Sequence, residues 1–161
     1  MVARERFDIP NLEKIWTWSD RVVYDLWDDK VLKVSKTARG LEQTAKGADY
    51  LLQDAGIIPE VFEQGRNYVV TEKIKIFKSM TPEERTIIKE FIEDIKDMKP
   101  WYREYPDVWK IQERLEKYWW EDLANYDMQT FWWGDIRKAN VGIKNKRPIL
   151  IDEWTIDLQN T

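Results

Sequence analysis

Apolar residues in the first part of the chain fall in short runs separated by polar turns, a pattern typical of β-strands. Residues 22–27 form one such run, residues 28–30 are turn-like, and residues 31–34 form a second run, so a hairpin is predicted. The preceding segment, residues 14–18, is predicted to add a third strand, and Gly40 interrupts the pattern.

Helical spacing of apolar residues then begins at residue 41 and continues to residue 55. Gly56 is suited to end this helix. Two more strands are predicted at residues 60–63 and 68–74, joined by a polar turn that contains a glycine. The apolar positions of the helix are Leu41, Ala45, Ala48, Leu51 and Leu52.

The next segment predicts a long amphipathic helix that begins at Thr81. Thr81 can cap the helix, Pro82 suits its first position, and Glu84 can complete a capping box. The pair Lys99-Pro100 is predicted to end it, and a second long helix is expected over residues 107–126.

The final segment predicts a loop followed by a short hairpin. Strands are predicted at residues 141–144 and 148–151, around a turn at Asn145-Lys146. The order is three strands, a helix, two strands, two helices, a loop and a hairpin. Strands grouped before helices predict an α+β protein, a single domain with two lobes.

Composition narrows the function classes. With 30 acidic and 26 basic residues among 161, the net charge of −4 does not favour a nucleic-acid binder. The chain has no cysteine and no histidine, which excludes Ser-His and Cys-His catalysis and leaves a carboxylate, Lys or Tyr as the general base. No apolar run approaches the ~20 residues of a membrane span, and the charged N-terminus lacks a signal-peptide core. A cytoplasmic protein without a membrane partner is expected.

Three polar residues near the C-terminus have the spacing that phosphoryl transfer requires. Asp135 is followed by Asn140 five residues later and by Asp152 twelve residues after that, at the end of the apolar run 148–151. One carboxylate can hold an attacking hydroxyl, while an amide and a second carboxylate can hold metal ions on the phosphates. The pattern resembles the catalytic loop and metal-binding turn of a kinase-like phosphotransferase.

The motifs and their order resemble the protein-kinase-like fold, including the aminoglycoside-phosphotransferase branch, and in particular the small kinase-like proteins of tailed bacteriophages. The resemblance covers residues 14–156 and implies a minimal two-lobed fold. Its N-lobe, residues 14–74, would be a five-stranded antiparallel sheet with one helix, and its truncated C-lobe, residues 75–161, would be mostly helical. The segments that carry it are Val22-Val23-Tyr24-Asp25-Leu26, Val31-Leu32-Lys33-Val34, Ile58-Pro59-Glu60-Val61 and Trp133-Gly134-Asp135.

The same resemblance implies a role for each candidate site residue, with ATP and Mg²⁺ as cofactors. It assigns Lys33, in the third strand, to the α- and β-phosphates, and backbone groups of Glu72 and Ile74 in the hinge to the adenine edge. It assigns Asp135 to the acceptor hydroxyl and Arg137 to the transferring phosphate. Asn140 and Asp152 are assigned to magnesium.

Four departures from the family pattern are present. No glycine-rich loop covers the phosphates, because residues 18–21 read Trp-Ser-Asp-Arg. Lys46 or Gly47 stands where a helix glutamate should pair with Lys33, and Glu42 or Asp49 could substitute only with a shifted helix. The metal-binding triplet is Asp152-Glu153-Trp154 in place of Asp-Phe-Gly, so the aspartate is kept and the flexible glycine is not. The sequence stops at Thr161, so no platform for a peptide substrate is expected and a conventional protein kinase is not predicted.

Three functions remain open on this basis. The leading hypothesis is a minimal phosphotransferase that binds ATP-Mg and phosphorylates an unknown acceptor. The alternative is an inactive pseudokinase that binds a nucleotide or a protein, for example a host factor in the host cytoplasm if the chain is of phage origin. A metal-dependent hydrolase is the weakest hypothesis, because histidine, the commonest transition-metal ligand, is absent.

Overall fold

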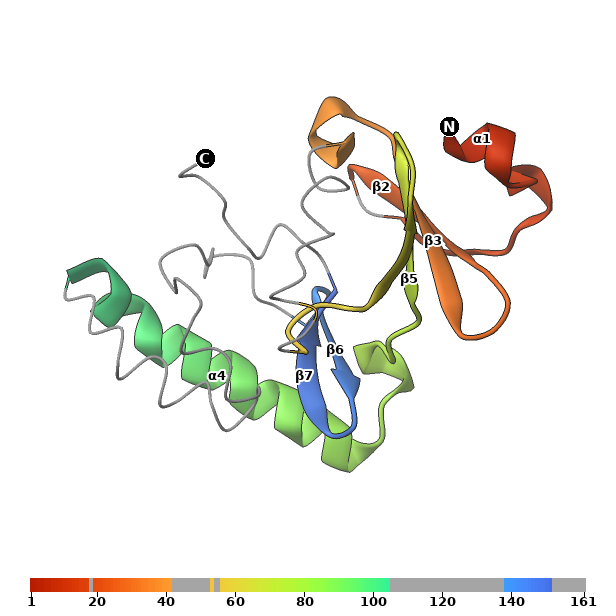
Figure 1. Ribbon diagram of the computed structural model, residues 1–161. Helices are drawn as coiled ribbons and strands as arrows, with labels where there is room; N and C mark the ends of the chain where they lie inside the picture. Colours follow the sequence, from red (N-terminus) through yellow and green to blue (C-terminus); the bar gives the residue numbers. More distant parts are fainter. Residues whose placement is uncertain (18, 42–52, 54–55, 105–137, 152–161) are drawn as a thin grey trace. The chain divides into compact units, whose positions relative to one another are not determined.

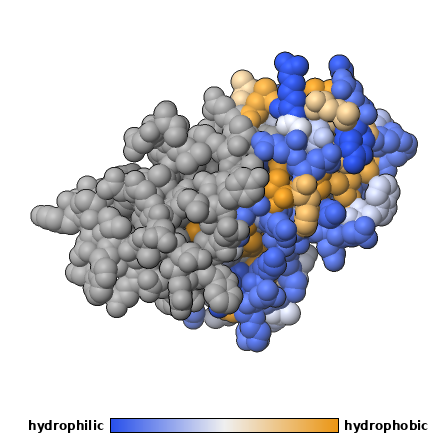
Figure 2. Space-filling model, viewed as in Figure 1, coloured by the Kyte–Doolittle hydropathy of each residue, from blue (hydrophilic) through white to orange (hydrophobic). Residues whose placement is uncertain are grey.

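The computed structural model describes residues 1–17, 19–41, 53, 56–104 and 138–151, with the backbone alone at residues 95 and 98–104 (Figure 1). Contacts divide the chain into two compact units. Unit 1 comprises Met1–Gln53 and Pro59–Lys73, and unit 2 comprises Asp54–Ile58 and Ile74–Thr161. Hydrophilic side chains cover much of the visible surface of the described residues, with apolar areas among them (Figure 2).

A five-stranded antiparallel sheet forms the centre of unit 1, in the order β1-β2-β3-β5-β4. All five strands predicted from the sequence are present, so the predicted α+β class with a five-stranded antiparallel sheet is confirmed. The predicted fifth strand is two residues too long, because β5 ends at Glu72. The strands are β1 Lys14–Thr17, β2 Arg21–Asp25, β3 Lys30–Ser35, β4 Val61–Gln64 and β5 Tyr68–Glu72.

An N-terminal segment that the sequence pattern did not reveal covers one face of this sheet. It contains α1 (Ala3–Arg6) and the 3₁₀ turn η1 (Ile9–Asn11), both too short to show a periodic pattern. The Phe7 ring meets the Tyr68 ring edge-on, with 5.3 Å between centroids. Asn67 accepts a hydrogen bond of 2.8 Å from the Ala3 N–H. The core under this segment contains Ala3, Leu32, Tyr68 and Val70, flanked by Phe7, Ile9, Leu12, Tyr24, Leu26 and Val34.

The helix after β3 begins earlier than predicted. Residues 38–41 are already helical, so Gly40 lies inside the first turn and does not precede the helix. Thr37 explains the early start, because its hydroxyl accepts the Gly40 N–H at 3.0 Å and its carbonyl accepts the Leu41 N–H at 3.1 Å. The rest of the helix predicted to residue 55 lies outside the described residues, apart from residue 53.

Unit 2 contains the long helix α4 (Pro82–Glu104). The predicted capping box is confirmed: the Thr81 N–H donates to the Glu84 carboxylate at 3.0 Å, and the Glu84 N–H donates to the Thr81 hydroxyl at 3.2 Å. The Thr81 N–H and then the Lys75 ammonium lower the pKa of Glu84. Ile88, Phe91 and Ile92 are buried along one face, each contributing about 1.5–3 kcal/mol.

The predicted end of this helix at Lys99-Pro100 is wrong, because α4 continues through Pro100 to Glu104. A proline inside a helix removes one N–H donor and costs about 3 kcal/mol, but it does not prevent later residues from being helical. The second helix, predicted over residues 107–126, lies outside the described residues.

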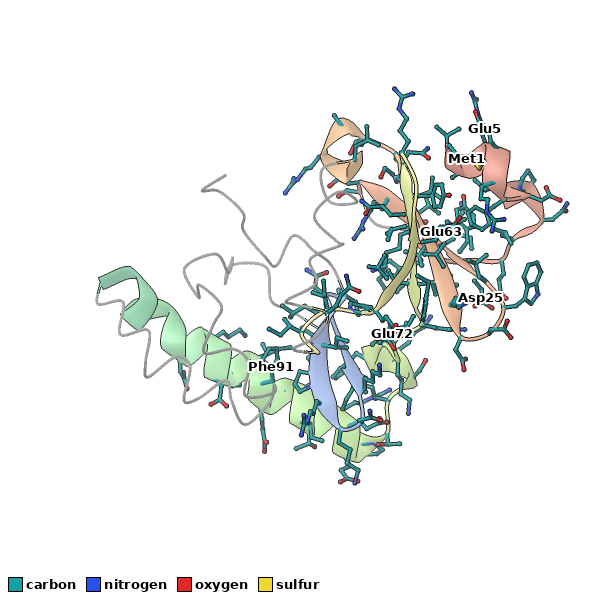
Figure 3. All side chains as sticks on the ribbon, in the orientation of Figure 1. Met1, Glu5, Asp25, Glu63, Glu72 and Phe91 are labelled. Atoms are coloured by element: carbon teal, nitrogen blue, oxygen red, sulfur yellow. The ribbon has the colours of Figure 1, made fainter. Side chains whose placement is uncertain are left out.

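The C-terminal hairpin is confirmed within one residue at each end. It pairs β6 (Val141–Lys144) with β7 (Arg147–Leu150). Asn145 and Lys146 have φ values of 52° and 60°, as a tight two-residue hairpin turn requires. The hairpin packs on α4, where Phe91 lies on the side that faces it (Figure 3).

None of the described helices combines the length and the apolar character needed to cross a bilayer.

Replacing Thr81 with Ala should lower the free energy of unfolding by about 1 kcal/mol, because the first turn of α4 loses its side-chain cap. Urea unfolding followed by circular dichroism measures the change. The control is Thr86→Ala within the same helix. The Thr86 hydroxyl donates only to the Pro82 carbonyl, so its loss should change stability by less than about 0.5 kcal/mol. Equal effects of the two substitutions would contradict the capping role.

Candidate functional site

Lys33 occupies the central strand of the sheet in unit 1 and is buried, with 3% of its surface exposed. It is paired with Val23 on β2 and with Val69 on β5. Side chains directly opposite each other in an antiparallel pair point to the same face. Lys33 therefore points away from the face that carries Leu32 and Val70, which the N-terminal segment covers.

A second buried cation lies on the face that carries Lys33. Arg21 opens β2 and is fully buried, and its partner in the register is Ser35, two residues after Lys33. The sequence interpretation assigned Arg21 to a loop and missed it. Arg21 lies two residues before Val23, so the two side chains would share one face of a strand. This signal can be used only when the strand boundary and the register are known.

The predicted hinge residue Glu72 has a structural role at the end of β5 (Figure 3). Its N–H donates to the Glu60 carbonyl at 3.0 Å, and its carboxylate accepts the Glu60 N–H at 2.9 Å. These two bonds join the chain before β4 to the end of β5. The side chain of Glu72 is thereby used within unit 1, and its backbone carbonyl accepts the Thr71 hydroxyl at 3.3 Å. The adenine contact assigned to Glu72 stays a prediction.

Ile74 begins the second stretch of unit 2 and is half-buried. Within the part of the chain that the structure describes, its N–H has no hydrogen-bond partner. The neighbouring Lys75 carbonyl, in contrast, accepts the Ile143 N–H at 3.0 Å. The assignment of Ile74 to an adenine contact stays a prediction.

Asn140 is buried at the start of the C-terminal hairpin, with 1% of its surface exposed. Its carbonyl accepts the Ile151 N–H at 3.0 Å, which continues the pairing of Val141 with Leu150 by one more step. The tight turn at the other end of the hairpin therefore returns the chain to Asn140 just before Asp152 in the sequence. The predicted magnesium ligand Asn140 is thus paired with Ile151, the residue that precedes the other predicted ligand in the sequence.

The remaining predicted site residues, Asp135, Arg137 and Asp152, lie outside the described residues. Their roles stay predictions. Within the described ranges, no group of three or more acidic, histidine or cysteine side chains could hold a metal ion.

Gly142 controls how closely the hairpin approaches the segment after Ile74. A Cβ atom at this position would lie 2.3 Å from Ile74 Cγ2 and 2.9 Å from the Lys75 carbonyl oxygen. The strand β6 can form its bridge between Ile143 and Lys75 only because residue 142 has no side chain. A glycine at the second position of this hairpin therefore supports the position of Asn140.

A cavity of about 690 Å³ is present in unit 1, but it lies by the other face of the sheet. Val70, which packs under the N-terminal segment, forms part of its wall, as do Phe7 and Leu12 of that segment. Lys33 and Arg21 do not line it. This cavity is therefore separate from the predicted phosphate-binding face.

A scan against protein-family models gave no match, and a search of curated proteins gave none either. Similar solved structures include three APH(2'') aminoglycoside phosphotransferases. The streptomycin–ATP complex of APH(2'')-IIa has a TM-score of 0.47 and 13% identity, over 91% of this chain and 67% of that one. ADP-bound APH(2'')-Ib has a TM-score of 0.48 and 14% identity, over 96% and 69%. The GDP and kanamycin complex of APH(2'')-IIia has a TM-score of 0.49 and 11% identity, over 96% and 70%.

These solved structures belong to the group of proteins that the sequence motifs resemble. With TM-scores below 0.5 and identities of 14% or less, neither family membership nor function follows from this similarity. The phage origin stays a prediction.

Replacing Gly142 with Ala should lower the free energy of unfolding by about 1–3 kcal/mol, because the added methyl group overlaps a backbone carbonyl as well as a side chain. Urea unfolding measures the loss. Lys89→Ala on the exposed face of α4 is the control and should stay within about 0.5 kcal/mol of the parent. A Gly142→Ala protein as stable as the control would show that the hairpin has room at this position.

Proposed function

We propose that this chain is a minimal kinase-like phosphotransferase that binds ATP with Mg²⁺ and transfers phosphate to an acceptor of unknown class. The observation that carries the proposal is the burial of Lys33 in the central strand, on the sheet face opposite the N-terminal segment. An ammonium group in a strand of buried valine and leucine is costly to bury. Lys33 makes interactions in the free chain that offset part of this cost, and a nucleotide phosphate would be a further anionic partner on this face.

Each site residue has a definite task in this proposal. Lys33 holds the α- and β-phosphates, and backbone groups of Glu72 and Ile74 orient the adenine. Asp135 orients the acceptor hydroxyl and accepts its proton, while Arg137 contacts the phosphate being transferred. The acceptor oxygen forms a bond to the γ-phosphorus as the bond to the β-phosphate oxygen breaks, and ADP leaves.

The donor groups of Asn140 and Asp152 fit magnesium, which prefers amide and carboxylate oxygens and retains several waters. These two residues would hold the ion. Bound Mg²⁺ would neutralise charge on the β- and γ-phosphates. The pairing of Asn140 with Ile151 supports this assignment, because it anchors one ligand and the residue before the other to the same hairpin end.

A second candidate is a pseudokinase that binds a nucleotide or a host protein without transferring phosphate. The turn between β1 and β2 favours it. This turn has no glycine, and the Asp20 carbonyl accepts the Lys36 N–H at 2.8 Å while its carboxylate accepts the Thr37 hydroxyl at 2.8 Å. A turn anchored in this way presents no glycine-rich backbone to phosphates. In this second proposal, the bound partner is a host protein and the binding takes place in the host cytoplasm.

Thermal unfolding with MgATP tests nucleotide binding. At a hundred times its dissociation constant, MgATP should stabilise the chain by about 2.7 kcal/mol, and Lys33→Met should remove most of that stabilisation. The control is Lys36→Met, an exposed lysine just after the same strand, which should respond like the parent. If millimolar MgATP stabilises none of the three proteins, the nucleotide-binding proposal is wrong.

Replacing Asp135 with Asn should leave MgATP binding unchanged and reduce phosphate transfer about 100-fold or more, because an amide cannot accept the hydroxyl proton. Release of ADP from ATP, measured with and without mixtures of candidate acceptors, follows the reaction. Asp97→Asn on the exposed side of α4 is the control and should retain parental activity. A parent that binds MgATP but releases no ADP would support the pseudokinase.

A further inference from the structure

Arg21 is the strongest feature that the proposed function leaves unexplained. We propose that its guanidinium is a second phosphate-binding group, which contacts the same polyphosphate as Lys33. The guanidinium would bind phosphate oxygens in place of the backbone amides of a glycine-rich turn, because residues 18–20 contain no glycine. This inference rests on the proposed function, since it names a further binding residue at the nucleotide site.

The strand register places the two cations close together. Arg21 is paired with Ser35 and Val23 with Lys33, so Arg21 and Lys33 are diagonal neighbours on one face of the sheet. Diagonal neighbours in antiparallel strands have Cα atoms about 7–8 Å apart, within reach of long side chains. Both residues are buried, with 0% and 3% of their surfaces exposed. Both belong to unit 1, so their proximity depends on this sheet alone.

The two cations on this face carry like charges at neighbouring positions. An anion placed between them would be attracted by both. Arg21 and Lys33 each make interactions in the free chain, so a phosphate group would share or replace existing contacts. A polyphosphate matches the pair, because it carries several charges along a short chain of oxygens.

The turn before Arg21 is built to hold it in place. Asp20 anchors this turn to the start of the following helix through Lys36 and Thr37, as described above, and the Arg39 guanidinium lies 3.8 Å from its carboxylate. Gly40 permits this approach, since a Cβ atom there would lie 2.3 Å from the Asp20 carbonyl oxygen. The residue that follows Asp20 therefore has a position determined by both the strand and the turn.

An arginine suits this position better than a lysine would. Its planar fork presents several N–H donors that match two phosphate oxygens at once. The dependence of affinity on the number of phosphates should therefore separate a phosphate-binding Arg21 from one that only supports the sheet. Loss of a phosphate contact weakens ATP and leaves adenosine unchanged, whereas loss of support weakens both.

Isothermal titration calorimetry with ATP, ADP and adenosine, each with Mg²⁺, tests the inference on the full chain. Arg21→Met should raise the ATP dissociation constant about tenfold or more and leave that of adenosine within about twofold. Arg21→Lys should raise the ATP dissociation constant by a smaller factor. Arg66→Met is the control, because Arg66 is an exposed arginine between β4 and β5, away from the turn before Arg21, and it should bind ATP like the parent.

Unchanged ATP affinity in Arg21→Met, or an equal loss for ATP and adenosine, would overturn the inference. If Lys33→Met weakens ATP binding in the same assay, the proposed function stands even then. If the parent binds no ATP, both fail together. If both Arg21 variants fail to fold, the test is a structure of the parent protein with a non-hydrolysable ATP analogue. The expected result is a hydrogen bond from Arg21 to a phosphate oxygen, and its absence overturns the inference.

Discussion

The antiparallel register of β2, β3 and β5 is the constraint on which the rest of unit 1 depends. It places Tyr24, Leu32 and Val70 on one face, where the N-terminal segment buries them. The alternate positions on the same strands then face the other way, and these include Lys33. A shift of one residue would exchange the two faces and place the lysine under the N-terminal segment. Burial of one apolar face thus determines where the cations lie.

In unit 2, strand pairing within the C-terminal hairpin likewise determines the position of a polar residue. The hairpin turn at Asn145 and Lys146 adopts positive φ at both residues, which makes the return strand pair without a bulge. The pairing extends to Asn140 and Ile151. Close approach of the hairpin to the segment around Lys75 depends on Gly142. A polar residue proposed to hold a metal ion is therefore positioned by backbone pairing and by the absence of a side chain.

The two proposed functions make different use of the same sheet. A phosphotransferase needs cations that grip phosphates and a carboxylate that acts on the acceptor, whereas a binding module needs only a stable scaffold. The anchored turn at Asp20 is compatible with both. In the first case it fixes Arg21 beside Lys33, and in the second it simply closes the edge of the sheet. The chemistry at Asp135 distinguishes the two, because only transfer requires a proton acceptor.

Strong local signals in the amino-acid sequence were enough to predict five strands, the capping box at Thr81 and the C-terminal hairpin. These signals are local because alternation, capping and turn chemistry involve residues only a few positions apart. The sequence also pointed to Lys33 and Asn140, both of which are buried. The helix that passes through Pro100 was not predictable, since a local breaker was overcome by the rest of the helix. That Arg21 shares a face with Lys33, and that the first residues cover the other face, became visible only in the folded chain. Both facts depend on strand register, which pairs residues distant in sequence.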